Sequence, residues 1–215
     1  MRLETKVLLI HHGVTDWHRD GKLLGRRDVP MNADGHRQAE AVASWLGGVE
    51  VAEVISSPLQ RAIKTAEIVG KKVGIEFARD PRLTDLKLGA WEGQASSEVM
   101  KSAEYAQFVA NPMSFSPPGG EALHEIRGRA VAAVEQALED NPAGAAVVVV
   151  THARVIRVLL AHYMAAPPAG YHRLRVHPGS VSILSFSHDS HNPQLVALNW
   201  LQPLSALLGE GESPV

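Results

Sequence analysis

The side chains with the clearest chemical potential are histidines and an arginine that follow short apolar runs of the sequence. His12 comes close after the apolar run 6–10. Arg61 lies shortly after the run 51–55, and His152 follows four consecutive valines. Near neutral pH an imidazole can act as a nucleophile, as an acid or base, or as a metal ligand. A guanidinium offers a planar fork of donors that fits phosphate or carboxylate. Together these side chains indicate a site that handles an anion.

These side chains can act together only if the fold brings the ends of the three runs to one place. The runs are short, apolar and rich in β-branched residues, which is typical of strands that are covered on both faces. Segments with helical spacing of apolar residues lie between them. This alternation predicts an α/β fold, a three-layer α/β/α sandwich whose mostly parallel sheet carries helices on both faces. Ligands of such sheets bind beyond the carboxyl ends of the strands.

The expected elements follow from apolar periodicity and from the glycines and prolines that bound it. The expected strands are 6–10, 51–55, 145–151, 180–187 and 195–200. The expected helices are 33–46, 58–73, 96–109, 121–138 and 155–163. We expect a single domain over residues 1–208 and a disordered tail over 209–215, because the tail is short, polar and rich in glycine.

Composition excludes several classes of function. The 215 residues include 21 Lys and Arg against 23 Asp and Glu, a formal net charge of −2, which argues against a basic surface for nucleic acid. The absence of cysteine excludes disulfides, thiol nucleophiles and cysteine metal ligands. The longest apolar stretch, 143–150, is far shorter than the ~20 residues of a membrane-spanning helix, and no signal-peptide core is present. We therefore expect a cytoplasmic protein without nucleic-acid or membrane partners.

Several segments form motifs that occur in a fixed order along the chain. The first expected strand ends in His11-His12-Gly13, and residues 56–66 contain Ser-Ser-Pro-Leu-Gln-Arg-Ala followed by Thr-Ala. The other motif segments are 25–32, 89–93, 118–121 and 151–152. Together they resemble the histidine phosphatase superfamily, which includes cofactor-dependent phosphoglycerate mutase. The resemblance extends from Val7 to about Ser187, and the combination is far more specific than any single motif.

The resemblance implies roles for residues that match the motif positions of the family. His12 matches the nucleophilic histidine, which attacks phosphorus and becomes a phosphohistidine. Asp85 lies where the family has the acid that protonates the leaving oxygen. Arg61 and His152 match the residues that hold the non-bridging oxygens, and Gly13 leaves room for a phosphate beside the backbone. The resemblance implies no metal and no other cofactor.

Four features of this pocket depart from the family pattern. His11 replaces an arginine, which removes a permanent charge and a bidentate contact. His18 replaces an asparagine, and Asp85 replaces a glutamate and is shorter by one methylene group. Ala153 and Arg154 replace two glycines, so that Arg154 becomes a new candidate for phosphate binding.

The candidate residues for binding phosphate or substrate come from four segments of the chain. They are His11, Gly13, His18, Gly25, Arg61, Ala153 and Arg154. If His11 and His18 line the pocket, they bind phosphate best when they are protonated. An unperturbed histidine has a pKa of ~6.5 and is largely neutral at pH 7. We therefore expect catalysis to favour mildly acidic pH.

The expected function is that of a phosphomonoesterase that acts through a phosphohistidine on a small phosphorylated metabolite. An alternative is a catalytically impaired phosphatase fold that binds a phosphate ligand or serves as a regulatory module. Phosphoglycerate mutase is less favoured, because family mutases carry longer insertions than the segment 91–118 allows. A metal site of His11, His12, His18 and Asp85 is disfavoured, because neighbours on one strand point to opposite faces. The family's dimers favour a homodimer.

Overall fold

The computed structural model describes residues 4–141, 143–187 and 193–201. They contain a six-stranded sheet in the order β3-β2-β4-β1-β5-β6. The strands are β1 (Glu4–His11), β2 (Val51–Ser56), β3 (Phe77–Arg79), β4 (Ala146–Thr151), β5 (Val181–Ser187) and β6 (Gln194–Trp200). The helices are α1 (Asp16–Arg19), α2 (Ala33–Trp45), α3 (Gln60–Val73), α4 (Ser96–Val99), α5 (Ala103–Ala110), α6 (Leu123–Asp140) and α7 (Ala153–Tyr163).

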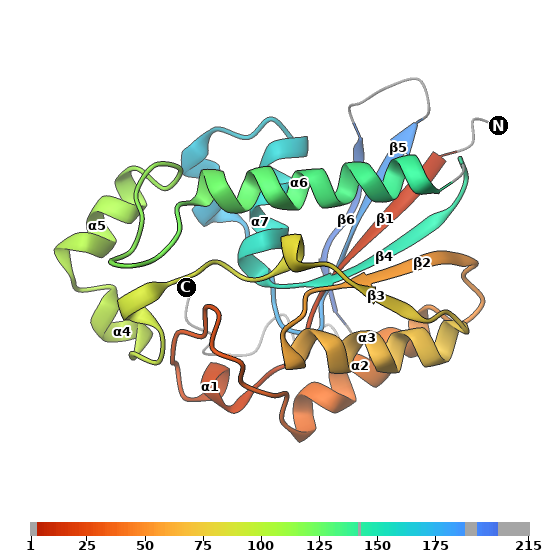
Figure 1. Cartoon of the computed structure of the whole chain (residues 1–215), viewed down its shortest axis with the longest axis horizontal. Helices are drawn as coiled ribbons and strands as arrows, with labels where there is room; N and C mark the ends of the chain where they lie inside the picture. The colour runs from red at the N-terminus through yellow and green to blue at the C-terminus, as the bar shows by residue number, and fades with distance from the viewer. Residues whose placement is uncertain (1–3, 142, 188–192, 202–215) are drawn as a thin grey trace.

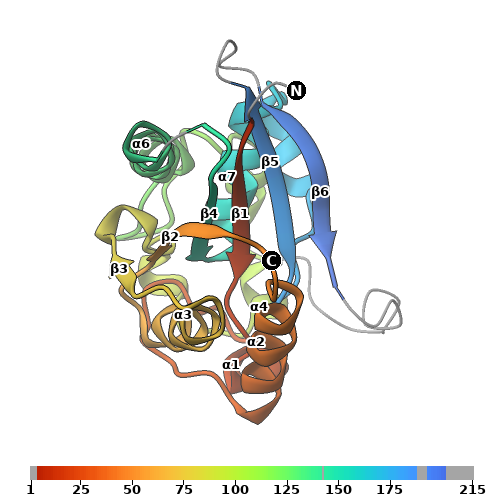
Figure 2. The same cartoon turned by 90° about the vertical axis from the view of Figure 1, so that its right-hand side faces the viewer.

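The sheet is mostly parallel, as its sequence pattern predicts. β1 pairs with β4, and β2 pairs with β3 and β4, all in parallel, whereas β5 runs antiparallel to both β1 and β6. Figure 2 shows β3 and β6 at opposite edges of the sheet. The register places His11 opposite Thr151 and Ser56 opposite Val150. The residues that follow β1, β2 and β4 therefore leave the sheet side by side.

Two layers of helices cover the two faces of the sheet. Along β1, Val7 and Leu9 belong to one buried cluster and Leu8 and Ile10 to the other, because successive strand residues point to opposite faces. Helices α6 and α7 pack on the first face, and α2 and α3 on the second (Figure 1). All six residues of β4 are buried, which explains its unbroken valine run. The three-layer α/β/α prediction is confirmed.

Some sequence-based boundaries differ from the structure. The single helix expected over 96–109 is two helices, α4 and α5, because the Ser102 side chain accepts a hydrogen bond from the Tyr105 N–H and starts a new helix. The short strand β3 and the one-turn helix α1 were not predicted. Helix α6 begins at Leu123 rather than Glu121. The expected tail 209–215 lies outside the described residues.

Among the described residues, three 3-10 turns connect these elements, at Pro81–Leu83, Gly89–Trp91 and Pro168–Arg173. In the part of the chain that the structure describes, no helix combines the length and the apolar character that crossing a membrane requires.

Candidate active site

A cavity of about 90 Å³ opens at the carboxyl ends of the parallel strands. Its wall comes from segments far apart in the sequence: the turn after β1, the loop before α4, the start of α7 and the loop before β5. Half of the lining residues are histidine, lysine or arginine. They include His11, His12, His18, Lys22, Asp85, Ala153, Arg154, Arg157, Arg175 and His177.

His12 has the tautomer of a nucleophile. Its Nδ1 lies 2.8 Å from the carbonyl oxygen of Gly13, so this nitrogen must carry the proton and donate it. Its Nε2 lies 3.0 Å from Nε of Arg61, which donates to it, so Nε2 carries a lone pair. Burial, followed by the charges of His11 and Arg61, lowers the pKa of His12 well below its ordinary value. The ring is therefore neutral at pH 7, with its lone pair at Nε2.

Arg61 is completely buried and does not line the cavity itself, but it contacts His12, which does. Its guanidinium donates to the carbonyl oxygens of Gly25 (2.8 Å) and Arg27 (2.7 Å) as well as to His12. Gly25 has a φ of +54°, a conformation that glycine adopts at low cost, and this turns its carbonyl toward the guanidinium. Arg61 also lies 3.5 Å from Asp85, so it links the nucleophile with the expected acid.

His152 is the N-cap residue of α7, and its buried ring lies beside that of His12. Its Nε2 lies 2.7 Å from the hydroxyl of Ser57, which directly follows β2. Its Nδ1 is buried, has no hydrogen-bond partner among the described residues, and lies 3.9 Å from Oδ2 of Asp85. The ring centroids of His12 and His152 are 5.1 Å apart. An unpaired buried nitrogen next to the nucleophile is suited to contact an oxygen of a bound phosphoryl group.

Asp85 is buried, and one of its oxygens faces the cations of the site. Oδ1 accepts a hydrogen bond from the Leu86 N–H at 2.8 Å. Oδ2 lies 3.5 Å from a guanidinium nitrogen of Arg61 and 3.5 Å from one of Arg154. Arg154, on the first turn of α7, therefore lies in the pocket. A bound phosphate brings negative charge to the same place, so it competes with Asp85 for both arginines.

His11 and His18 line the cavity beside His12. The ring centroid of His12 is 4.5 Å from that of His11 and 5.5 Å from that of His18. Nδ1 of His18 accepts a hydrogen bond from the Thr15 N–H at 3.2 Å and so forms part of the cap of α1. Burial, followed by the charges of Arg61 and Arg154, lowers the pKa of His18 to about 3. Burial, followed by the charge of His18, lowers the pKa of His11 well below 6.5.

The expectation that these two histidines act as cations at mildly acidic pH is therefore wrong. The prediction assigned both histidines the ordinary histidine pKa. In the structure the rings are buried and lie near several guanidinium groups, and each of these two effects favours the neutral ring. His18 is therefore neutral between pH 5 and 8, the lowered pKa of His11 favours its neutral ring as well, and the positive charge of the site comes from arginines and a lysine.

The objection to a histidine metal cluster also needs correction. His11 and His12 do not point to opposite faces, because β1 ends at His11 and the chain then turns. One nitrogen from each of His11, His12 and His18 lies within 4.8 Å of the others. What disfavours a cation here is charge: Nε2 of His12 already accepts from Arg61, and Asp85 pairs with arginines.

Gly13 and Ala153 differ in what they contribute. A Cβ on Gly13 would lie 2.2 Å from the carbonyl oxygen of Gly35 in α2, so this glycine is explained by packing against α2 and not by room for phosphate. Ala153 lines the cavity on the first turn of α7. This eleven-residue helix points its N-terminus at the cavity, which favours an anion there.

The structure adds residues that sequence reasoning missed. Arg129 of α6 forms a bidentate ion pair with Glu121, both N···O distances being 3.0 Å. It also donates to the carbonyl oxygens of Arg82, Thr84 and Asp85. Arg129 thus fixes the loop that carries the expected acid. No local pattern reveals this, because the partners lie far apart in the sequence.

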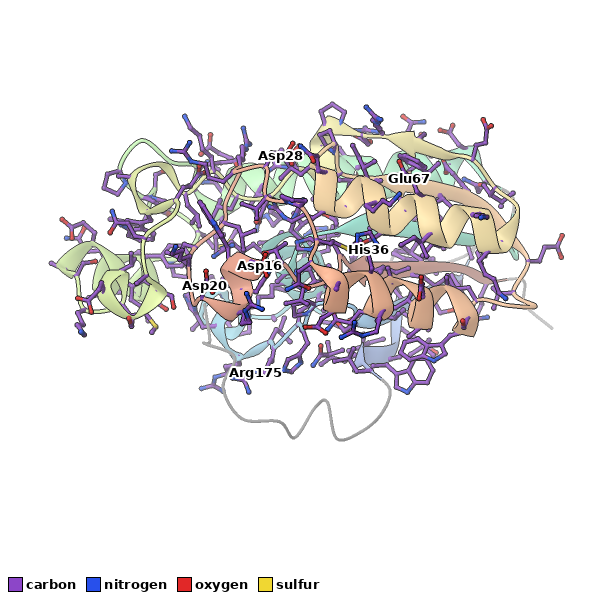
Figure 3. All side chains as sticks on the ribbon, turned by 90° about the horizontal axis from the view of Figure 1, so that it is seen from below. Asp16, Asp20, Asp28, His36, Glu67 and Arg175 are labelled. Atoms are coloured by element: carbon purple, nitrogen blue, oxygen red, sulfur yellow. The ribbon has the colours of Figure 1, made fainter. Side chains whose placement is uncertain are left out.

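Arg157 is the second residue that was missed. It lies on α7 within an otherwise apolar run, Val155–Leu160, and is buried in the cavity wall. A charged residue inside a buried helix segment was the signal that could have identified it. Other titratable side chains lie elsewhere: His36 is on α2 and Glu67 on α3 (Figure 3), and neither lines the cavity, whereas Arg175 does.

Comparison with known proteins agrees with this geometry. The model of the histidine phosphatase superfamily (branch 1) matches residues 7–201. A probable phosphoglycerate mutase, GpmB, of Yersinia enterocolitica is 31% identical over 186 residues, which cover 86% of each chain. The solved structure of a mycobacterial glucosyl-3-phosphoglycerate phosphatase superposes with a TM-score of 0.82 at 26% identity and covers 92% of this chain and 100% of that one.

A phosphoserine phosphatase from Entamoeba histolytica, solved as a mutant in complex with phosphoserine, is similar to the same extent. Its TM-score is 0.81 at 25% identity, with 92% of this chain and 98% of that chain covered. The family model spans nearly the whole described chain, and the motif residues Arg61 and His152 both contact His12 in the wall of the cavity. The protein belongs to the histidine phosphatase superfamily.

Proposed function

We propose that this protein is a phosphomonoesterase that hydrolyses a small phosphorylated metabolite through a phosphohistidine on His12. The observation that carries the proposal is the hydrogen bonding of His12. Its proton is held at Nδ1 by the Gly13 carbonyl, so the lone pair of Nε2 faces Arg61. Nitrogen donors of Arg61, Arg154 and His152 lie within 4 Å of Asp85 and can bind phosphoryl oxygens.

The proposed reaction has two steps. When the phosphate takes over Arg61 and Arg154, Asp85 takes up a proton from solvent in the first turnover and from the attacking water thereafter. Nε2 of His12 attacks phosphorus, the ester P–O bond breaks, and the protonated Asp85 gives its proton to the departing alkoxide. Arg61, Arg154 and Nδ1 of His152 hold the non-bridging oxygens as their charge is redistributed. A water molecule then gives its proton to Asp85 and attacks phosphorus, the N–P bond breaks, and inorganic phosphate leaves. Atoms and charge balance without any metal.

The relatives support small phosphorylated metabolites as the substrate class. Those with solved structures include phosphatases of glucosyl-3-phosphoglycerate and of phosphoserine, whereas a relative of 31% identity is named as a probable phosphoglycerate mutase. Mutase activity is therefore the second candidate. We favour hydrolysis, because the segment 91–118 forms only the short helices α4 and α5, and a mutase must keep water from its phosphoenzyme.

The first experiment measures hydrolysis of p-nitrophenyl phosphate from pH 5 to 8. We expect turnover, and we expect His12→Ala to lower kcat/KM by a factor on the order of 10³ or more, with loss of the acid-labile phosphoenzyme. His36→Ala, which alters a histidine on α2 away from the cavity, is the matched control. Wild-type activity equal to that of His12→Ala at every pH would instead support a module that binds phosphate without turnover.

The role of Asp85 is tested by comparing leaving groups. Asp85→Asn should lower kcat/KM about 10²-fold or more for an alkyl phosphate, whose alkoxide needs a proton. The loss should be much smaller for p-nitrophenyl phosphate, because nitrophenolate leaves without protonation. Equal losses on both esters would contradict the acid role. Dialysis against EDTA should leave both rates unchanged, and transfer of phosphate to added glycerate would favour the mutase.

Three further parts of the proposal concern the whole protein. The family match over 7–201 supports a single domain over residues 1–208. We propose that this domain acts in the cytoplasm and binds no nucleic acid, as its net charge of −2 suggests. We also propose a homodimer, for which light scattering of the purified protein at several concentrations is the direct measurement.

A further inference from the structure

His177 begins a tight turn that is tied to the segment carrying the proposed nucleophile. The Ser180 N–H donates to the His177 carbonyl oxygen at 3.1 Å, and Gly179, the third residue of the turn, has a φ of +73°, which is typical of a type II turn. The Gly179 N–H donates to the carbonyl oxygens of His11 and His12 at 3.0 and 3.1 Å. These bonds hold the backbone of His177 close to the end of β1, and the half-buried His177 lines the cavity.

Asn199 holds His177 from the side of β6. Its φ of +51° lies in the left-handed region, which asparagine enters more readily than most residues. The pairing of β5 with β6 is irregular here, with a register shift between Val181 and Ile183. The Asn199 N–H donates to the side-chain oxygen of Ser182 at 3.0 Å. Irregular strand pairing of this kind re-aims a side chain, and the Asn199 side chain is aimed at His177.

The Asn199 side chain determines which nitrogen of the His177 ring carries the proton. Its amide oxygen Oδ1 accepts a hydrogen bond from the backbone N–H of His177 at 2.7 Å. Because a backbone N–H can only donate, this contact fixes the orientation of the amide and places Nδ2 2.7 Å from Nδ1 of the ring. An amide nitrogen donates and does not accept, so Nδ1 must accept. The neutral ring therefore carries its proton at Nε2, on the side away from Asn199.

The Nε2–H group of His177 is a donor that the proposed mechanism does not use. The groups proposed to hold the phosphoryl oxygens come from α3 and the start of α7, whereas His177 belongs to the loop before β5, another part of the cavity wall. Within the part of the chain that the structure describes, this nitrogen makes no hydrogen bond. A donor held in place beside a ligand cavity is suited to recognise an acceptor atom of the bound molecule.

We propose that His177 donates a hydrogen bond from Nε2 to a hydroxyl oxygen in the alcohol portion of the substrate, and that Asn199 is the positioning residue that fixes this donor. Other groups hold the phosphoryl oxygens, so the partner of His177 belongs to the alcohol portion. The N–H of a neutral ring lacks the charge that favours a carboxylate, so a hydroxyl oxygen is the better match. This inference rests on the proposed phosphatase function and adds a residue that determines which alcohol portion the site accepts.

Two alkyl phosphates that differ in their hydroxyl groups test the role of His177. Glycerol 3-phosphate carries hydroxyls that n-propyl phosphate lacks, and we define the selectivity ratio as kcat/KM for the first ester divided by kcat/KM for the second. The two alcohols also differ as leaving groups, so the decisive quantity is the change of this ratio between variants at pH 8. His177→Phe, which keeps a ring and loses the donor, should lower the ratio about 3- to 10-fold, the range of one hydrogen bond between neutral groups.

Two further variants control for this substitution. His177→Gln, whose amide can donate near the position of Nε2, should restore part of the ratio. His36→Phe, on α2 outside the cavity, should keep the wild-type ratio. An unchanged ratio in His177→Phe would overturn the proposal. Thermal unfolding midpoints show whether each variant folds.

Asn199→Asp tests the tautomer with a side chain of the same shape. One carboxylate oxygen can still accept from the His177 backbone N–H, and the other accepts from Nδ1, which draws the ring proton to that nitrogen. Long-range proton–nitrogen NMR spectra of ¹⁵N-labelled protein at pH 8 show which ring nitrogen is protonated, and His177→Phe identifies the resonances by their absence. We expect Nε2 to be protonated in the wild type and Nδ1 in the variant. Protonation of the wild-type ring at Nδ1 would overturn the proposal.

The selectivity ratio should follow the tautomer. In Asn199→Asp it should fall as it does in His177→Phe. Gln136→Glu, which adds the same charge on the exposed side of α6, is the matched control and should keep the wild-type ratio. If the ring of Asn199→Asp keeps a proton at Nε2, the ratio should stay at its wild-type value. Loss of selectivity with Nε2 still protonated would overturn the proposal.

A binding experiment separates this inference from the proposed function. Glycerol 3-phosphate or n-propyl phosphate is added to ¹⁵N-labelled His12→Ala, which lacks the nucleophile, and the Nε2–H resonance of His177 is followed. A shift caused by glycerol 3-phosphate alone supports the contact even if the wild-type protein hydrolyses neither ester. No shift at the highest ligand concentration would overturn the role of His177, whereas hydrolysis of p-nitrophenyl phosphate by the wild type would still support the phosphatase.

Discussion

At the scale of single residues, the same close contact explains why positions 13 and 35 are both glycine. The turn after β1 lies directly against the first turn of α2, and each glycine occupies space next to the backbone of the other. A Cβ on Gly35 would lie 2.2 Å from the Val14 carbonyl oxygen. This contact holds the segment that carries His12 against α2, so it contributes to the geometry of the nucleophile without touching substrate.

Gly13→Ala should therefore destabilise the protein. The added methyl group would overlap the Gly35 carbonyl oxygen and the Met31 sulfur, 2.2 and 2.6 Å away, and the backbone cannot move freely on either side. Overpacking of this kind costs about 1–3 kcal/mol. Urea denaturation followed by circular dichroism measures the change in the free energy of unfolding.

Gly128→Ala provides the matched control for that substitution. Gly128 lies inside α6, and a Cβ there would meet no atom within 4 Å. Because alanine favours a helix more than glycine does, this variant should be more stable by roughly 0.5–1 kcal/mol. Similar destabilisation of both variants would contradict the assignment of a packing role to Gly13.

At the scale of elements, α6 does more than cover the sheet. Arg129 connects it to the loop that runs from Arg82 to Asp85, and Glu121, just before the helix, holds the guanidinium in place. Burial acts to raise the pKa of Glu121, but hydrogen bonds and charge from Arg129 outweigh it and lower that pKa. Thr151, the last residue of β4, fixes the same loop through the Leu83 carbonyl oxygen at 2.7 Å.

Arg129→Met should weaken both stability and catalysis. The variant leaves the carbonyl oxygens of Arg82 and Thr84 without this donor, whereas Glu121 and the Asp85 carbonyl oxygen keep Arg26, so we expect a loss of about 1–3 kcal/mol of unfolding free energy. Because Asp85 loses its support, kcat for an alkyl phosphate should fall more than KM rises. Arg129→Lys, which keeps the charge, should recover part of kcat. An unchanged kcat in Arg129→Met would show that α6 does not position the acid.

The sequence predicts the elements that bury continuous apolar runs and misses those that do not. β1, β2 and β4 are found because both of their faces are covered. β3 is missed because it has three residues, of which Phe77 is half-buried and the other two are exposed. His12, Arg61 and His152 are brought together because they follow parallel strands. Arg129 and Arg157 lie on helices, and their roles depend on contacts that no local pattern encodes.

At the scale of the whole molecule, buried neutral histidines make stability depend on pH. Burial is the main cause that lowers the pKa of His11, His12, His18 and His152 below the unfolded value of ~6.5. As the pH falls through 6.5, the unfolded chain binds protons that the folded chain does not. The stability that these rings confer is therefore complete above pH 6.5 and is lost as the pH falls toward the folded pKa, about 3 for His18.

We expect the unfolding free energy to decrease steeply between pH 6.5 and 5. Each buried histidine contributes up to about 1.4 kcal/mol per pH unit once the unfolded chain is protonated. His18→Asn should reduce the slope of unfolding free energy against pH by up to the contribution of one proton, about 1.4 kcal/mol per pH unit. His36→Asn, on α2 outside the cavity, should change this slope less. Urea titrations at several pH values give the slope directly. A free energy independent of pH over this range would contradict neutral burial of the histidines.

The order of the strands has a consequence for how the protein is made. β1 emerges first from the ribosome, yet its neighbours in the sheet are β4 and β5, which begin at residues 146 and 181. At ~5–20 residues per second, synthesis of the roughly 135 residues between β1 and β4 takes about 7–27 s. During that time the apolar residues Val7–Ile10 have no strand to pair with. We therefore expect this apolar segment to stay without its native neighbours until β4 has been synthesised.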